Sequence, residues 1–212
     1  MGVASEQPVL ALAGVETLIG PYHILHGVDL EVPPLGLTML LGRNGAGKTT
    51  TLRTIMGLWK ASRGSIRFDV DEIARRDTPD IALAGVGYVP ETMGIFAGLT
   101  VRENLVLAAR HGDIDDSRLH RIFELFPALK RFWTLPAGNL SGGQKQMLAT
   151  ARAIIEPKKL LLIDEPTKGL APAIIANMID AFRELKRTTP LLVVEQNFRF
   201  ARELGDTVAV MD

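Results

Sequence analysis

The sequence contains Gly42-Arg43-Asn44-Gly45-Ala46-Gly47-Lys48-Thr49, which fits the pattern G-x-x-x-x-G-K-[ST]. The apolar run 37–41 before it is typical of a strand, and 48–58 after it has the pattern of a helix. A glycine-rich loop in this position can wrap its backbone amides around phosphate groups, aided by the positive end of the helix dipole. A turn that merely connects strand to helix is the alternative, but the lysine and the flanking elements favour a nucleoside triphosphate site.

Two side chains of this segment are expected to act directly on a nucleotide. Lys48 would reach the β and γ phosphates, and the Thr49 hydroxyl would bind Mg²⁺. The other residues would contribute mainly backbone contacts, so Arg43 and Asn44 are given secondary roles. The predicted nucleotide-binding set is Gly42, Arg43, Asn44, Gly45, Ala46, Gly47, Lys48, Thr49 and Thr50.

The composition is that of one globular domain. The 212 residues include 24 Lys plus Arg and 24 Asp plus Glu, so the formal net charge is zero, and 47% of the residues are hydrophobic. Balanced charge argues against nucleic acid as the main partner, and the lack of cysteine excludes disulfides, zinc–thiolate sites and cysteine nucleophiles. The apolar runs are too short to cross a bilayer, and residues 1–8 are expected to form a loose tail rather than a secretory signal. The sequence therefore predicts a cytoplasmic protein.

Short apolar runs alternate with helical patterns along the chain, which is typical of an α/β fold with a mostly parallel sheet. Strands are predicted at 37–41, 159–163, 190–194 and 207–211. One helix is predicted to start at Ser141 and to carry Met147, Leu148, Ala151, Ile154 and Ile155, and another to place Ile174, Met178, Phe182 and Leu185 on one face.

Residues 100–126 are expected to form a helical insert, two helices with no strand between them. Thr100 and Glu103 have the spacing of a capping box, which predicts a helix start at that point. Later in the insert, apolar residues recur at i, i+3, i+4 and i+7, which gives a helix with one apolar face. Pro127 marks the expected end of that helix. The residues of that face, assigned to the core rather than to a ligand site, are Leu119, Ile122, Phe123 and Phe126.

A second motif is an apolar strand that ends in two adjacent acids, Asp164 and Glu165. Beside a phosphate-binding loop, such acids hold Mg²⁺ and activate water. Asp164 would orient the metal, and Glu165 would act as the general base. Alone, the pair would indicate only a solvated turn, so the interpretation depends on the loop at 42–49.

A third motif, Leu140-Ser141-Gly142-Gly143-Gln144, opens the helix that precedes the acidic strand. It creates a second helix N-terminus able to bind an anion. An ordinary serine cap followed by loop glycines is the alternative for this pentapeptide in isolation. The order of the three motifs favours a nucleotide-binding role.

With these motifs in this order, the sequence resembles the nucleotide-binding subunits of ATP-binding cassette (ABC) transporters from about Val9 to its last residue. The resemblance implies a P-loop NTPase of the ABC ATPase fold, with an N-terminal antiparallel β-subdomain. Its core would span about 9–90 and 141–212, and the helical subdomain, about 91–140, would meet a membrane permease. Two cassettes would sandwich ATP head to tail, so that the signature residues serve the partner's ATP. Those residues are Ser141, Gly142, Gly143 and Gln144.

Three further segments look like the branched-chain amino acid importer ATPase of the LivF type. They are Tyr88-Val89-Pro90-Glu91, Pro166-Thr167-Lys168-Gly169-Leu170-Ala171-Pro172 and Val194-Glu195-Gln196-Asn197. Glu91 falls where most cassettes have a glutamine that touches Mg²⁺, and a carboxylate remains a suitable ligand. Gln196 falls where most have a histidine that contacts the γ-phosphate, and its amide can donate the same hydrogen bond. These departures lead us to expect weak or partner-dependent ATPase activity.

Other positions were assigned on the same resemblance or left open. Ile19 takes the place of the usual adenine-stacking aromatic, and Tyr22 is equally expected to stack or to be an exposed turn residue. Gly169 is expected at the dimer interface, with a simple turn glycine as the alternative. The chain ends near a strand where family members usually continue through a hairpin and helix. The four histidines have no metal-ligand spacing and are expected in surface or loop positions: His23, His26, His111 and His120.

The leading hypothesis is thus an ATP-hydrolysing importer subunit on the cytoplasmic face of the membrane. Its partners would be permease subunits, a second cassette of the same or a different chain and, indirectly, a substrate-binding protein. A urea or amide importer ATPase shares the same subfamily pattern. A soluble ABC-type ATPase of translation or DNA maintenance is disfavoured by the short chain and neutral charge. A non-hydrolytic regulatory module is disfavoured because Lys48, Asp164 and Glu165 are intact.

Overall fold

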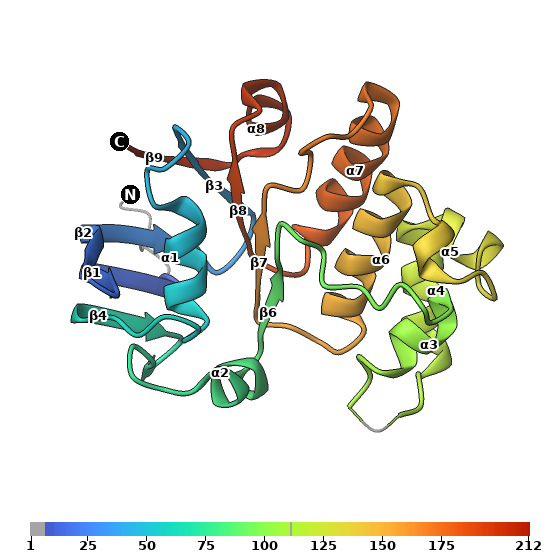
Figure 1. Ribbon diagram of the computed structural model, residues 1–212, viewed down its shortest axis with the longest axis horizontal. Coiled ribbons are helices and arrows are strands. Elements are labelled where there is room, and N and C mark those ends of the chain that lie inside the picture. Colours follow the sequence, from blue (N-terminus) through green and yellow to red (C-terminus); the bar gives the residue numbers. More distant parts are fainter. Residues whose placement is uncertain (1–6, 111) are drawn as a thin grey trace, which may run out of the picture.

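The computed structural model describes residues 7–110 and 112–212. Most of the predicted tail at 1–8, and His111, therefore lie outside the described residues. These residues form two sheets with helices packed around them (Figure 1).

The core sheet has five strands in the order β6-β7-β8-β3-β9, and each neighbouring pair runs parallel. Its strands are β3 (Leu37–Gly42), β6 (Val86–Val89), β7 (Leu160–Asp164), β8 (Leu191–Glu195) and β9 (Thr207–Met211). The predicted strands at 37–41, 159–163, 190–194 and 207–211 are confirmed within one residue at each end. Strands buried on both faces read as continuous apolar runs, which explains why the sequence pattern found them.

The second sheet is antiparallel and has the order β2-β1-β4-β5. Its strands are β1 (Leu10–Ile19), β2 (Tyr22–Val32), β4 (Arg63–Phe68) and β5 (Asp71–Glu72). Helix α1 (Lys48–Ile55) lies between this sheet and the core sheet (Figure 1). The antiparallel N-terminal sheet that the resemblance implied is thus confirmed, and α1 contacts strands of both sheets.

The remaining helices lie on the other side of the core sheet, apart from α2 (Thr78–Ala84) and α8 (Phe198–Leu204) (Figure 1). Helices α6 (Gly142–Ile154) and α7 (Pro172–Leu185) stand beside the sheet. The outer group contains α3 (Val101–Val106), α4 (Asp116–Leu125), α5 (Pro127–Arg131) and the short 3₁₀-helix η1 (Ala137–Asn139).

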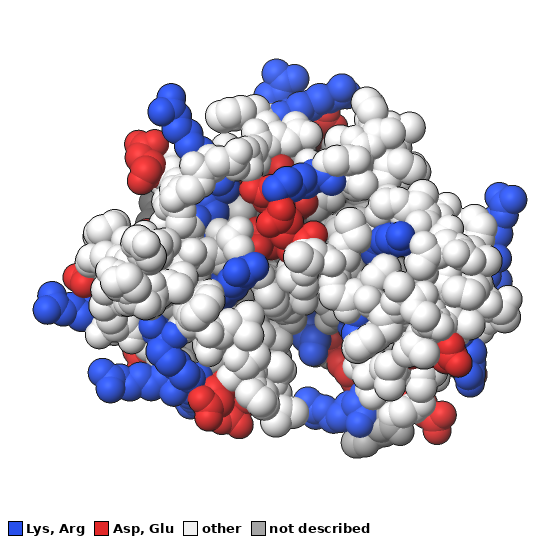
Figure 2. All heavy atoms as spheres, viewed as in Figure 1, with Lys and Arg blue, Asp and Glu red and all other residues white. Residues whose placement is uncertain are grey.

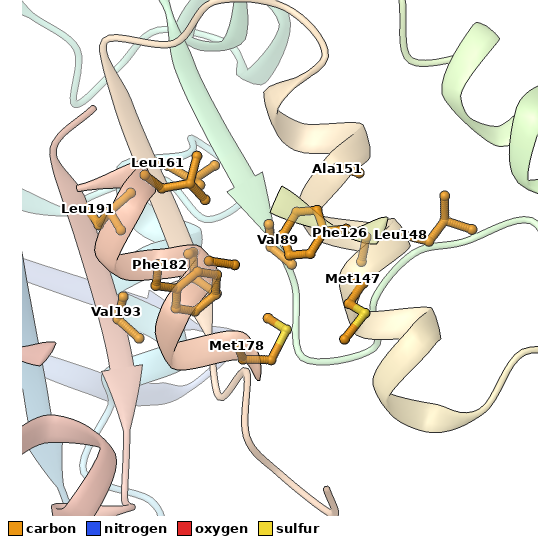
Figure 3. Packing of buried hydrophobic residues seen from close by; sticks show 14 of the residues in the cluster. Val89, Phe126, Met147, Leu148, Ala151, Leu161, Met178, Phe182, Leu191 and Val193 are labelled. Carbon is orange, nitrogen blue, oxygen red and sulfur yellow. The ribbon is translucent and has the colours of Figure 1, made fainter. Parts of the chain in front are cut away.

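Two apolar clusters fill the space on the two faces of the core sheet, and β7 contributes alternate residues to each. Leu160 and Leu162 pack toward the antiparallel sheet and α1, whereas Leu161 and Ile163 pack toward the helices. Figure 3 shows the cluster on the helical side, in which Phe182 of α7 lies beside Leu191 and Val193 of β8. Burying both faces of β7 fixes the position of its carboxyl end, where Asp164 lies.

The expected apolar faces of three helices are confirmed. On α6 the buried residues include Met147, Leu148 and Ala151, and on α7 they include Met178, Phe182 and Leu185. The third face belongs to α4. Ile122 and Phe126 are fully buried, and Leu119 and Phe123 pack against the same cluster. The capping box of α3 is present, because the Glu103 amide donates to the Thr100 hydroxyl at 3.1 Å and the Thr100 amide donates to the Glu103 carboxylate at 2.7 Å.

The structure corrects one predicted helix limit and confirms another. Helix α1 ends at Ile55, three residues before the expected Leu58, because Gly57 has a φ of 71°, in the left-handed region that ends helices. Pro127 does follow the end of α4, but it also opens α5 as that helix's first residue.

Candidate functional site

The loop between β3 and α1 has the form of a phosphate cradle. Lys48 is only 5% exposed, and its Nζ donates to the carbonyl oxygens of Gly42 and Arg43, both at 2.8 Å. Gly47 is the N-cap of α1 and has a φ of 99°. The ammonium of Lys48 is thereby held against the loop at the positive end of the helix dipole, where phosphate oxygens bind.

Asp164 at the end of β7 is joined directly to this loop. The Thr49 hydroxyl donates to Asp164 Oδ1 at 2.9 Å, and the Tyr88 hydroxyl lies 3.5 Å from Oδ2. Burial raises the pKa of Asp164, and the charges of Glu91 and Glu165 add to that rise against the hydrogen bond from Thr49. Burial and the charge of Asp164 also raise the pKa of Tyr88 to about 12, so its hydroxyl remains a donor.

The oxygens of Thr49 and Asp164 are of the kind that Mg²⁺ prefers, namely hydroxyl and carboxylate. Glu91, the third predicted ligand, is brought to the same region by Lys168, whose ammonium pairs with both Glu91 and Glu165. No group of three or more His, Asp and Glu side chains in residues 7–110 and 112–212 forms a metal cluster by itself. The donor set therefore fits a cation that is also held by phosphate oxygens, as Mg²⁺ is when it binds with a nucleotide.

Glu165 begins the loop after β7 and has a φ of 46°, which is uncommon outside glycine and typical of constrained functional positions. Its amide donates to the carbonyl of Val194 at 2.9 Å, which fixes the backbone beside β8. Glu165 Oε1 accepts a hydrogen bond from Gln196 Nε2 at 2.6 Å. The same Nε2 donates to Asn44 Oδ1, also at 2.6 Å.

Gln196 therefore links the phosphate loop to the predicted general base. The sequence pattern predicts a mainly backbone role for Asn44 and does not predict this side-chain contact. The two residues are 152 positions apart, so no local pattern could have paired them.

Glu195, just before Gln196, is a buried anchor of the same region that the sequence analysis did not assign. Its carboxylate accepts from the backbone amides of Thr167, Gln196 and Asn197 at 2.9–3.1 Å. Because it ties the loop after β7 to the end of β8, it holds Glu165 and Gln196 near each other.

Glu91, after β6, is paired with a residue that the sequence analysis gave no role. Lys168 Nζ lies 2.5 Å from Glu91 Oε1 and 3.3 Å from Glu165 Oε2. The hydrogen bonds to Glu91 and Glu165 raise the pKa of Lys168. Figure 2 shows acidic side chains gathered with a basic one over the ends of β7 and β8.

The signature motif forms the N-terminus of α6, away from these contacts. Ser141 is the N-cap and makes a capping box with Gln144, whose Oε1 accepts from the Ser141 amide at 2.9 Å. Ser141 and Gly142 are exposed, whereas Gly143 is buried against Ile174 of α7. Among the described residues, no hydrogen bond or ion pair joins 140–144 to 42–50.

Arg43, Asn44, Gly45 and Ala46 also line an open cavity of about 660 Å³ together with residues of β2 and β9. Thr50, the last of the predicted loop set, lies half-buried in the first turn of α1. Ile19 and Tyr22 face each other across the β1–β2 pair, and Tyr22 is 69% exposed.

The histidines that the structure describes agree with the expected surface positions. His23 and His26 lie on strand β2 with their rings 4.0 Å apart, and His120 pairs with Glu124 on α4.

Within the described part of the chain, no helix combines the length and apolar character needed to cross a membrane.

Comparison with known proteins supports the resemblance drawn from the motifs. A family model described as ABC transporter matches residues 25–168. The high-affinity branched-chain amino acid transport ATP-binding protein BraG of Pseudomonas aeruginosa is 39% identical over 207 residues, covering 96% of this chain and 89% of BraG. The probable branched-chain amino acid transport ATP-binding protein LivF of Archaeoglobus fulgidus is 36% identical over 193 residues, covering 89% of this chain and 82% of LivF.

A solved ATP-binding subunit of an ABC transporter has the same fold, with a TM-score of 0.82 at 27% identity, covering 96% of this chain and 85% of that one. The predicted family and fold are therefore confirmed. The three motifs occur in order, the phosphate loop is bonded to the acid at the end of β7, and the matches span nearly the whole chain. The chain thus belongs to the ABC transporter family, in which it is an ATP-binding subunit and an ATPase.

Proposed function

We propose that this chain energises the uptake of branched-chain amino acids through a separate permease. Two relatives that carry this description, from a bacterium and an archaeon, match most of the chain and support the substrate class. The observation that carries the ATPase assignment is the Thr49–Asp164 hydrogen bond, which joins the phosphate loop to the acidic end of β7.

Each site residue has a defined role in this proposal. The loop amides and Lys48 bind the β and γ phosphates, and Thr49, Asp164 and Glu91 would hold Mg²⁺. The bound Mg²⁺ would neutralise charge on the phosphates. Glu165 accepts the proton of the attacking water as general base. Tyr88 donates to Asp164 and keeps its second oxygen oriented.

Gln196 is proposed to donate to the γ-phosphate. An amide nitrogen carries two protons, and Nε2 of Gln196 already donates to Asn44 and to Glu165. It must therefore release one of these partners to contact the phosphate. Release of Glu165 would couple the arrival of ATP to the freeing of the general base, whereas release of Asn44 would leave Glu165 held by the amide.

The signature is proposed to serve the ATP of a second cassette, which would be this chain or a different one. The exposure of Ser141 and Gly142 at the N-terminus of α6 leaves their side of the helix open to such a partner. We further propose that 91–140 acts as the helical subdomain that meets the permease, with 9–90 and 141–212 as the core. The subunit would then work on the cytoplasmic face of the membrane, with the substrate-binding protein on the opposite face. Gly169, in the loop between β7 and α7, would lie at the cassette interface.

Uptake of labelled leucine tests the transport proposal. Cells that lack this subunit should regain leucine uptake when supplied with the wild-type chain but not with Glu165→Gln. Purification of the tagged chain from gently solubilised membranes should recover a permease and a second cassette. Urea uptake that depends on the chain while leucine uptake does not would contradict the substrate class, and recovery with ribosomes or DNA instead of a permease would contradict transport.

A further inference from the structure

Lys168 joins two carboxylates that come from distant parts of the chain. It lies in the loop between β7 and α7, three residues after Glu165, and Glu91 lies 77 positions before it. Its Nζ is 2.5 Å from Glu91 Oε1 and 3.3 Å from Glu165 Oε2. We call the three residues the carboxylate bridge.

The backbone of the loop directs Lys168 toward these acids. The Lys168 amide donates to the Glu165 carbonyl at 3.2 Å, which closes a tight turn after the left-handed residue Glu165. The side chain of Lys168 is 60% exposed, while that of Glu165 is only 10% exposed. The lysine therefore lies on the solvent side of the predicted base and helps to cover it.

Both oxygens of Glu165 are engaged in this arrangement. Oε1 accepts from Gln196 at 2.6 Å, and Oε2 faces the ammonium of Lys168. A general base must present an oxygen within hydrogen-bond reach of the water whose proton it takes. Charge-assisted contacts of this kind hold a carboxylate in one orientation, so the water has to compete with Lys168 and Gln196 for the same oxygens.

Lys168 also competes for the oxygens of Glu91. That carboxylate is the third predicted Mg²⁺ ligand, and a lysine ammonium already supplies one positive charge beside it. A cation arriving at Glu91 gains less than it would beside an unpaired carboxylate, because the local negative charge is partly cancelled.

We propose that Lys168 is a positioning residue that restrains the general base and moderates the Mg²⁺ affinity of the site, so that hydrolysis is slow until the bridge opens. The proposal rests on the assignment of Glu165 as general base under the proposed function. Lys168 does not touch the reacting atoms; it acts through the two carboxylates.

Steady-state hydrolysis by the purified full chain tests the first half of the proposal. Lys168→Met should raise kcat about two- to five-fold, the range expected for loss of an exposed ion pair. Its KM for ATP in Mg²⁺ should fall rather than rise, because the metal-bound nucleotide is then held more tightly. Lys168→Arg keeps the charge and should behave as wild type. Lys159→Met is the matched control, since Lys159 is also 60% exposed, pairs with one carboxylate (Asp69) and lies just before the opposite end of β7. An unchanged or lower kcat in Lys168→Met would overturn the restraint.

Calorimetric measurement of ADP binding tests the second half of the proposal, the effect of Lys168 on Mg²⁺, without depending on hydrolysis. The ratio of the ADP dissociation constant in EDTA to that in Mg²⁺ should rise about two- to five-fold in Lys168→Met, and should not change in Lys159→Met or Lys168→Arg. An unchanged ratio in Lys168→Met would overturn the effect on the metal. Hydrolysis by Glu165→Gln at the wild-type rate would instead refute the general base itself, and the calorimetric ratio would still decide whether the bridge acts on the cation.

Discussion

Replacement of Gly143, in the signature, by alanine is predicted to destabilise the fold because the added side chain has no room. A Cβ on Gly143 would lie 2.2 Å from Cγ2 of Ile174 in α7. Ordinary contacts between carbon atoms are about 3.5–4.0 Å, so Gly143→Ala must push α6 and α7 apart or force Ile174 out of its rotamer. Overpacking of this kind costs about 1–3 kcal/mol, against a gain of about 0.5–1 kcal/mol from replacing glycine by alanine in a helix.

Gly142 supplies the matched control. A Cβ there would have Leu170 Cδ2 as its nearest atom, at an ordinary 3.7 Å. Gly142→Ala should therefore be neutral or stabilising by up to about 1 kcal/mol. We expect Gly143→Ala to be less stable than Gly142→Ala by about 2 kcal/mol.

Urea unfolding followed by circular dichroism measures both free energies of unfolding, provided that the slopes agree. Ile174→Ala should rescue Gly143→Ala, because it removes the atom that clashes, and the double mutant should be more stable than the sum of the two single effects. Equal stability of Gly142→Ala and Gly143→Ala, or the absence of any rescue, would refute the packing argument.

Two further predictions concern the charge of Asp206 and the hydroxyl of Thr49 as a Mg²⁺ ligand. Partial burial alone would raise the pKa of Asp206, but the hydrogen bonds from Lys186 and from the Leu37 amide hold that pKa below its ordinary value. The ionised carboxylate therefore stabilises the folded chain above the unfolded pKa of about 3.9. This stability is lost as the pH falls through the lower folded pKa. Asp206→Asn should cost about 0.5–1 kcal/mol at pH 7 and progressively less in acid, as urea unfolding at several pH values will measure. Asp180→Asn, whose carboxylate pairs with Arg183 on its own helix, should cost less than about 0.5 kcal/mol. A cost for Asp206→Asn that does not fall in acid would contradict the linkage. Thr49→Val removes the donor to Asp164 and should abolish Mg²⁺-dependent hydrolysis. It should also lower the free energy of unfolding by about 1–3 kcal/mol, because the buried carboxylate loses a hydrogen-bond partner. Thr49→Ser should retain activity and stability, and an active Thr49→Val would exclude the hydroxyl as a ligand.

The sequence was sufficient for the elements whose physical signals are local. The phosphate loop has fixed glycine and lysine spacing, the core strands are apolar because both faces are buried, and the capping box of α3 is set by residues three positions apart. For α6 the sequence predicted the Ser141 cap, and the structure adds the return contact from Gln144. The antiparallel sheet was expected only through the family resemblance, since β1 and β2 alternate irregularly around register shifts.

The contacts that define the site in detail could not be derived in this way. Gln196 meets Asn44 across 152 positions, and Lys168 meets Glu91 across 77. Only the order of strands in the core sheet brings these segments together, because the carboxyl ends of parallel strands meet at one edge. A lysine three residues after the predicted base was the one local sign of the carboxylate bridge.

The most direct test of the account compares ATP hydrolysis and ATP binding in wild type and Glu165→Gln. The wild-type chain should hydrolyse ATP in Mg²⁺, and Glu165→Gln should bind ATP with unchanged or higher affinity while its kcat falls by at least about 100-fold, the usual contribution of a general base. Hydrolysis by Glu165→Gln at the wild-type rate would contradict the assignment of Glu165 and with it the mechanism proposed for this ATPase.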